Sequence, residues 1–208
     1  MIAGTAYGVV LNDREELAKL RPVFMEPPYK APPSAPVVYI KPRNCFASCG
    51  AAVQLDHDVQ HVTIASTLAL FFGRDASQTS ENSGLRYVDA ACLAIDVSVS
   101  HDSYYRPPIA QRCRDKFLPL GGFAAVPALP LEIVTHVDGV EAHRWSLDRL
   151  ARPIGKLIAD LTSFMTLRAG DLLMVGLPGD APGASRGQSV TVRATGLRDL
   201  TMHIEAAP

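Results

Sequence analysis

The sequence lacks any apolar run approaching the roughly 20 residues that a membrane-spanning helix needs, and it has almost no net charge. Its 20 basic and 21 acidic residues give a formal charge of −1. Without an excess of one sign there is no long-range field to favour nucleic acid or an anionic membrane, so we expect neither as a partner. The first five residues carry no basic segment typical of a secretory signal, which predicts a cytoplasmic protein.

Cysteine is also scarce, with four residues in 208. We interpret the chain as reduced, as is usual in the cytoplasm. Structural zinc is the alternative, because Cys45 and Cys49 are followed by His57 and His61, and both spacings suit zinc ligands. Only seven residues separate the two pairs, and no helix pattern carries the histidines, so we favour the reduced chain.

Local patterns predict more strands than helices. A strand over residues 2–11 precedes a short helix that Asn12 or Asp13 caps and Pro22 ends. A second helix starts at Pro153 and has an apolar stripe at spacings of three and four. Residues 84–91 are interpreted as one or two helical turns. Alternating or apolar runs predict strands over residues 37–41, 64–72, 93–99, 131–137, 140–145, 172–175, 189–194 and 200–204.

These elements predict one α+β domain over residues 1–208 that is mostly β. Few helices separate the strands, which argues for mainly antiparallel pairing and against a doubly wound sheet. Asp138-Gly139, between two of the runs, is a strong hairpin signal. Residues 1–36 form a lead-in of strand, short helix and a segment with five prolines between residues 27 and 36.

Several stretches together resemble the fumarylacetoacetate hydrolase family. They are residues 38–44 (Val-Tyr-Ile-Lys-Pro-Arg-Asn), 67–74, 94–98, the helix-to-strand segment 164–173, and the turn Gly176-Leu177-Pro178-Gly179. The resemblance implies that family's fold, with mixed sheets and short flanking helices, and usually a dimer. Residues 28–33, 103–109 and 112–115 resemble one branch, the isomerase/decarboxylases of 4-hydroxyphenylacetate degradation, which are fused tandem proteins or two subunits. This chain resembles the first half or subunit.

The resemblance implies a Mg²⁺ or Mn²⁺ site that acts on 2-oxo acids, with a Glu-x-Glu pair and an aspartate as ligands. In this sequence the two glutamates fall on Ala65 and Thr67, and the aspartate falls on Asp96. One carboxylate is too little for a dedicated site, so we expect metal binding to be weak or absent. A family lysine falls on Arg112, and a histidine–glutamate pair has no clear counterpart in residues 12–16.

The candidate catalytic residues are therefore Asp96 and Arg112, and Asp96 is the single retained metal ligand. Tyr105, Arg106 and Arg114 are candidates for gripping a carboxylate substrate, because arginine forks match carboxylates. Structural roles stay open for each. Asp96 would pair with Arg112 or Arg114, and the tyrosines beside Arg106 would pack and cap a loop.

Three functions follow from the resemblance. The first is a subunit of the isomerase/decarboxylase, acting on 5-carboxymethyl-2-oxo-hex-3-ene-1,6-dioate and 2-hydroxyhepta-2,4-diene-1,7-dioate. The second is a non-catalytic partner of a metal-bearing homologous subunit. The third is a metal-free protein that binds dicarboxylates. The resemblance implies a small 2-oxo dicarboxylic or tricarboxylic acid as ligand, and either a homodimer or a pair with a homologous second subunit.

Overall fold

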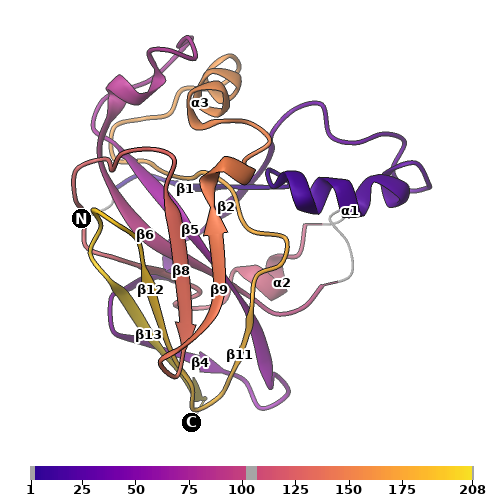
Figure 1. Ribbon diagram of the computed structural model, residues 1–208, viewed down its shortest axis with the longest axis vertical. Coiled ribbons are helices and arrows are strands. Elements are labelled where there is room, and N and C mark those ends of the chain that lie inside the picture. The colour runs from indigo at the N-terminus through magenta and orange to yellow at the C-terminus, as the bar shows by residue number, and fades with distance from the viewer. Residues whose placement is uncertain (1–2, 102–106, 208) are drawn as a thin grey trace.

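The computed structural model describes residues 3–101 and 107–207, and within them the strands form two sheets (Figure 1). The larger sheet runs in the order β2-β1-β10-β5-β6-β7-β3, with β11 also paired to β5. Its strands are β1 (Ala6–Val10), β2 (Val37–Lys41), β3 (Phe46–Ser48), β5 (His61–Phe72), β6 (Val88–Ser98), β7 (Leu118–Leu120), β10 (Leu172–Met174) and β11 (Gly183–Ser185).

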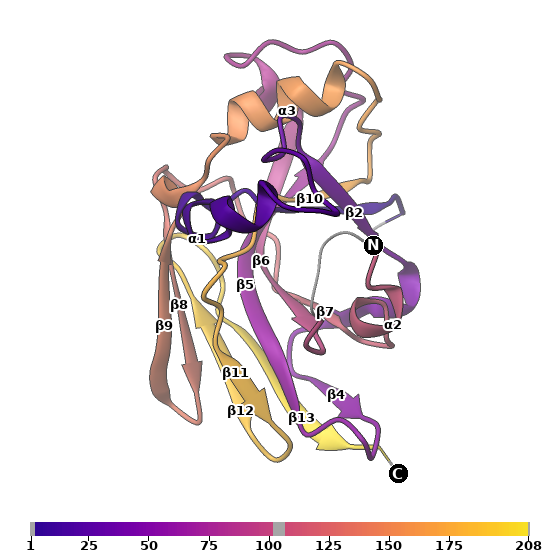
Figure 2. The same ribbon diagram turned by 90° about the vertical axis from the view of Figure 1, so that its right-hand side faces the viewer.

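The smaller sheet runs in the order β4-β13-β12-β8-β9. Its strands are β4 (Ala51–Leu55), β8 (Glu132–Val137), β9 (Val140–Ser146), β12 (Ser189–Arg193) and β13 (Leu200–Ala206). Figure 2 shows β8 and β9 on one side of the long strands β5 and β6. A buried hydrogen bond of 2.7 Å from Thr135 on β8 to Ser66 on β5 links the two sheets. Most strand pairs are antiparallel, as predicted, although β1–β10, β4–β13 and β3–β7 are parallel.

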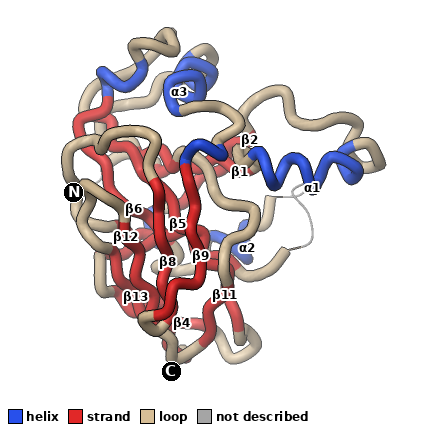
Figure 3. Tube along the Cα trace, viewed as in Figure 1, coloured by secondary structure: helices blue, strands red, loops and turns tan. Residues whose placement is uncertain are grey.

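Helices are short and lie outside the sheets (Figure 3). They are α1 (Arg14–Phe24), α2 (Ile109–Arg112) and α3 (Ile154–Thr162), with the single turns η1 (Arg43–Cys45), η2 (Gly84–Tyr87) and η3 (Leu147–Arg149). The predicted stripe of α3 is buried at Ile154, Leu157, Ile158 and Leu161. Among the described residues, no helix combines the length and the hydropathy that spanning a membrane would require.

Strands β5 and β6 position the candidate site, and both faces of this strand pair are buried. On one face Ile64, Leu68 and Leu70 of β5 join Leu93 and Ile95 of β6 in the main hydrophobic core. Side chains alternate between the faces of a strand, so the residues between these point to the other face. That second face carries smaller clusters, which include Ala65 on β5 and Ala94 on β6. It leaves room for polar side chains.

Two local predictions were wrong at their boundaries. Asp13 does cap α1, accepting a hydrogen bond from the Glu15 amide, but Pro22 does not end the helix, which continues to Phe24. Proline disfavours a long continuation of a helix, and here the helix runs only two residues past Pro22, where the Met25 amide bonds to the Pro22 carbonyl. The helical turn predicted over residues 84–91 is only η2, because β6 begins at Val88 and pairs there with β5.

The four residues of the alternative zinc site do not share one environment. Cys45 is fully buried in a cluster with Leu118, and burial raises the pKa of its thiol to about 12. Cys49 is exposed and contacts Thr201 on β13, whereas His61 contacts Ser185 on β11. In the part of the chain that the structure describes, no three His, Cys, Asp or Glu side chains gather as metal ligands.

The Asp138-Gly139 turn joins β8 and β9 as predicted. Both residues have positive φ, 49° and 80°, which matches the tight turn that the twist of a hairpin favours. Glycine adopts this conformation without the steric cost of a Cβ atom.

We therefore expect Gly139→Ala to lower the free energy of unfolding by about 1–2 kcal/mol, the usual cost of the left-handed conformation for a residue with a side chain. No atom lies within 4 Å of the added methyl group, so the loss comes from the backbone alone. Gly183→Ala is the control, because its Cβ meets only the Val62 carbonyl at 3.8 Å. Urea unfolding measures the free energy of unfolding of both variants. Equal values for the two would contradict the turn geometry.

Candidate functional site

Asp96 lies in the middle of β6, on the face turned away from the main core. It is fully buried. The register of β5 and β6 places Ala65 directly opposite Asp96, and Thr67 opposite Ala94. Positions 65, 67 and 96, which the family resemblance predicts as the metal-ligand positions, therefore share one face of the sheet.

The Asp96 carboxylate is surrounded by three donor side chains from two elements, β2 and α2. Lys41, at the end of β2, places its Nζ 3.2 Å from Asp96 Oδ1, and Arg112 on α2 places Nη1 3.4 Å from the same oxygen. The Tyr39 hydroxyl donates to Asp96 Oδ2. Burial, and then the negative charge of Asp96, raise the pKa of Tyr39 well above its usual value, so the phenol stays protonated. Two cations thus face one carboxylate.

Lys41 is the most enclosed member of this group. Its side chain has no exposed surface, and its Nζ also donates to the carbonyls of Val97 (3.1 Å), Arg112 (2.5 Å) and Phe117 (3.0 Å). A buried ammonium needs both a counter-charge and acceptors for its protons, and this arrangement supplies both. Lys41 therefore ties β2 to β6 and to the segment that carries Arg112.

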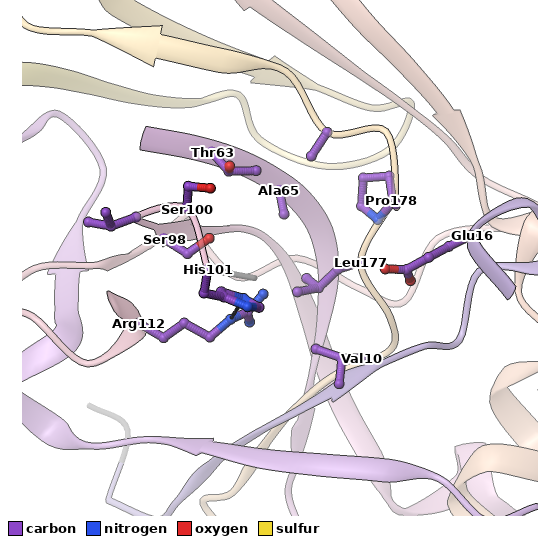
Figure 4. Close-up of a pocket in the computed structure, with 13 residues that line it drawn as sticks. Val10, Glu16, Thr63, Ala65, Ser98, Ser100, His101, Arg112, Leu177 and Pro178 are labelled. Carbon is purple, nitrogen blue, oxygen red and sulfur yellow. Dashed lines mark hydrogen bonds between the residues drawn. The ribbon is translucent and has the colours of Figure 1, made fainter. Parts of the chain in front are cut away.

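A polar cavity of about 230 Å³ opens beside Ala65 (Figure 4). Thr63, Ala65 and Ser98 form its floor on β5 and β6. Figure 4 shows His101 and Arg112 reaching in from one side and Glu16 of α1 from the other. The remaining lining includes Val10, Val99, Ser100, Leu177, Pro178, Gly179 and Ala181.

Arg112 connects the buried carboxylate to this cavity. Its guanidinium stacks over the Tyr39 ring, with 4.9 Å between Cζ and the ring centroid, and Nε donates to His101 Nε2 at 3.4 Å. His101 must accept this hydrogen bond through an unprotonated nitrogen. Arginine keeps its charge at any ordinary pH, so Arg112 offers the cavity a permanent positive charge whose orientation is fixed.

The residues present do not fit a divalent metal ion. Ala65 has no donor atom, and the Thr67 hydroxyl is buried and donates to the Gly176 carbonyl at 2.5 Å. Asp96 is already held by two cations and a phenol. Magnesium and manganese require several oxygen ligands, which this face does not supply.

The structure brings only part of the predicted site together. Asp96 and Arg112 form an ion pair, which was one of the structural alternatives given for Asp96. Arg114 instead pairs with Asp56 at 2.6 Å and does not line the cavity. Tyr105 and Arg106 lie outside the described residues, so their proposed contact with substrate stays a prediction.

Sequence reasoning missed the roles of Tyr39, Lys41 and Glu16. Tyr39 and Lys41 are two residues apart on β2, so they share a face. Residues 38–44, which include Lys41-Pro42, resemble a family motif, but the motif did not indicate that Lys41 pairs with Asp96. Glu16 was one of two acidic residues in the first turn of α1, and only the structure shows that it, and not the exposed Glu15, borders the cavity.

Comparison with known proteins agrees with this fold. A family model for the fumarylacetoacetate hydrolase C-terminal domain matches residues 5–205. The chain therefore belongs to the fumarylacetoacetate hydrolase family.

Among curated relatives, the 4-hydroxyphenylacetate degradation bifunctional isomerase/decarboxylase of Salmonella dublin is 36% identical over 198 residues. The match covers 95% of this chain and 46% of that protein, so the chain spans about half the length of this relative. A mitochondrial oxaloacetate tautomerase of Arabidopsis thaliana is 25% identical over 184 residues, covering 84% of this chain and 82% of the relative.

Solved structures share the fold at low sequence identity. The 5-carboxymethyl-2-hydroxymuconate delta-isomerase of Mycobacterium smegmatis superposes with a TM-score of 0.84 at 22% identity, covering 100% of this chain and 78% of the other. The fumarylpyruvate hydrolase of Pseudomonas aeruginosa, solved with Mn²⁺ and pyruvate, gives 0.82 at 18% identity, covering 98% and 90%.

The ion pair predicts a large effect of Asp96→Asn on stability. Removing this charge leaves Lys41 buried without a counter-ion, which typically costs about 3–5 kcal/mol. Asp199→Asn is the matched control, because its pair with Arg193 at 2.9 Å is exposed and such pairs contribute at most about 1 kcal/mol. Urea unfolding of both variants measures the difference. Equal losses would show that Asp96 does not compensate the buried cation.

Restoring the two glutamates tests the metal-ligand positions. Ala65→Glu combined with Thr67→Glu places two carboxylates on the face that carries Asp96, so millimolar Mg²⁺ should raise the melting temperature of the variant but not of the parent. We expect a stability cost mainly at Thr67, since that position is fully buried whereas Ala65 borders the cavity.

The control is the pair Ala65→Gln and Thr67→Gln, which adds the same volume without charge. If the glutamate variant folds and does not respond to Mg²⁺, these two positions are not the lost ligand positions.

Proposed function

We propose that this chain is one subunit, or one half, of an isomerase/decarboxylase of 4-hydroxyphenylacetate degradation. Its substrates would be 5-carboxymethyl-2-oxo-hex-3-ene-1,6-dioate and 2-hydroxyhepta-2,4-diene-1,7-dioate. The observation that carries this proposal is the 36% identity to the Salmonella dublin isomerase/decarboxylase across 95% of this chain. The proposal includes a cytoplasmic location and pairing with a second copy or with a homologous subunit.

The cavity supports an acidic ligand. Arg112 borders it on the side opposite Glu16, and its positive charge is only partly offset because Asp96 is shared with Lys41. A guanidinium fork matches a carboxylate in shape and charge. Hydroxyl groups of Thr63, Ser98 and Ser100 in the same lining add neutral donors for a carboxylate or an adjacent carbonyl.

The described residues do not supply a complete set of metal ligands, which limits what this half does alone. Decarboxylation of a 2-oxo acid develops negative charge on an enolate, and a divalent cation in this family stabilises that charge. Asp96, bound by its cations, does not replace that site. We therefore assign the metal-dependent step to a homologous half that carries the Glu-x-Glu pair, while this chain binds acid and supports the partner.

A metal-free dicarboxylate-binding protein is the second candidate. The position of Arg112 favours it, because an arginine that borders a polar cavity binds a carboxylate without help from a metal. The two candidates differ in whether a homologous subunit gains activity from this chain.

We expect this chain alone to decarboxylate 5-carboxymethyl-2-oxo-hex-3-ene-1,6-dioate no faster than the uncatalysed reaction, with or without Mg²⁺. Co-expression with a homologous subunit that has the intact Glu-x-Glu pair should give an active complex that co-purifies, more active than that subunit alone. Absorbance of the conjugated substrate follows the reaction. Mg²⁺-dependent turnover by this chain alone would contradict the assignment, and acid binding without association would favour the second candidate.

A further inference from the structure

We propose that Arg149 is a positioning residue for the cavity. Helix α1 and the loop between β10 and β11 form two parts of one cavity wall, and Arg149 joins the start of the helix to that loop. The inference rests on the proposed function in so far as the cavity binds an acid. Arg149 does not itself line the cavity, so it acts through Asp13 and Asp180.

The wall in question has two parts that touch. One is Glu16 on α1, and the other is the connection between β10 and β11, which contributes Leu177, Pro178 and Gly179. A Cβ atom built on Gly179 would lie 2.4 Å from the Cβ atom of Glu16, so glycine allows the loop to approach the helix closely. The shape of the cavity therefore depends on how α1 and this loop are held together.

Asp13 forms the first part of the link. Its side chain is fully buried, caps α1 through the Glu15 amide, and accepts a hydrogen bond of 2.9 Å from the Gly179 amide. One carboxylate thus fixes both the first turn of the helix and the loop. A buried carboxylate also needs a positive partner to offset its loss of hydration.

Arg149 supplies that partner from η3, which follows β9 in the smaller sheet. Its Nε donates to Asp13 Oδ1 at 3.1 Å, and Nη2 donates to Asp13 Oδ2. On the other side, Nη1 and Nη2 donate to the two oxygens of Asp180, at 3.1 and 2.9 Å. A planar guanidinium with five donors can bridge two carboxylates in this way, whereas a lysine ammonium cannot reproduce both forks.

Asp180 directly follows Gly179, so the second fork holds the same loop again. His143 Nε2 also lies 3.1 Å from Asp180 Oδ1. Although partial burial opposes it, hydrogen bonds from Arg149 and His143 lower the pKa of Asp180 to about 2, which keeps it charged. Without Arg149, the carboxylates of Asp13 and Asp180 would lose the cation that they share, and repulsion between the two like charges would favour movement of the loop away from α1.

Arg149→Ala and Arg149→Lys test the inference, with Arg144→Ala as the matched control. Arg144 lies on β9 of the same hairpin and also bridges two carboxylates, Glu132 and Glu141, but it is about half exposed and does not line the cavity. Calorimetric titration with 2-oxoglutarate, a small 2-oxo dicarboxylate, measures the affinity of the cavity for an acid. Amide hydrogen exchange of residues 176–181 measures how firmly the loop between β10 and β11 is held.

We expect Arg149→Ala to weaken 2-oxoglutarate binding about tenfold or more, because the wall that α1 and the loop form together would no longer be held in place; tenfold corresponds to about 1.4 kcal/mol of binding free energy. Arg149→Lys should give an intermediate loss, and Arg144→Ala none. Exchange of the Gly179 amide should accelerate in both Arg149 variants. Low millimolar guanidinium chloride should restore binding to Arg149→Ala, and ammonium chloride should not, which separates positioning from a general loss of stability.

Unchanged Gly179 exchange in a folded Arg149→Ala or Arg149→Lys protein would overturn the inference, as would parental affinity in both variants. If the parent does not bind 2-oxoglutarate, the proposed acid-binding function fails for this probe, and the exchange measurement still decides whether Arg149 holds the loop. If Arg149→Ala does not fold, Arg149→Lys decides, because it retains the charge and changes only the forked geometry.

Discussion

The buried Asp96 carboxylate, held between Lys41 and Arg112, is the interaction on which the rest of the site depends. An aspartate without exposed surface is stable only when cations and hydrogen-bond donors replace its hydration. Here those donors come from β2 and from α2, so one charge draws together segments that lie more than 50 residues apart. The same arrangement directs the guanidinium of Arg112 into the cavity.

This arrangement also explains why the site differs from that of a metalloenzyme. A divalent cation needs several carboxylate or carbonyl oxygens that are free to bind it. In this chain the positions opposite and beside Asp96 are Ala65 and Thr67, and the aspartate is bound by protein cations. On the side of the cavity opposite Glu16, positive charge therefore comes from the Arg112 side chain. The opposite wall, with Glu16 and the Gly179 loop, is fixed separately by Asp13 and Arg149.

Much of the fold was predictable because its signals are local. The Asp138-Gly139 turn and the helix after Pro153 depend on a few neighbouring residues, and both were found. The strands β3, β4, β7 and β11 were missed, because three to five residues carry no clear period and these strands pair with distant segments.

The candidate site likewise has a part that local sequence patterns predict and a part that depends on the whole fold. Alternation along one recognised strand was enough to place residues 65 and 67 on one face, and the family resemblance added residue 96 to the same set. It did not show that β2 delivers Lys41 to Asp96, because the sheet order that brings them together is a property of the whole chain. Likewise, two adjacent glutamates in the first turn of α1 look alike in sequence, and only packing against the Gly179 loop distinguishes Glu16.

We propose that this cavity binds organic acids through side-chain cations and not through a metal ion. The most direct test is calorimetric titration of the parent protein with a 2-oxo dicarboxylate, first in excess EDTA and then in millimolar Mg²⁺. The account predicts the same dissociation constant in both conditions, and no detectable binding by an Arg112→Met variant that remains folded. Binding that appears only with Mg²⁺, or that persists unchanged in Arg112→Met, would contradict it.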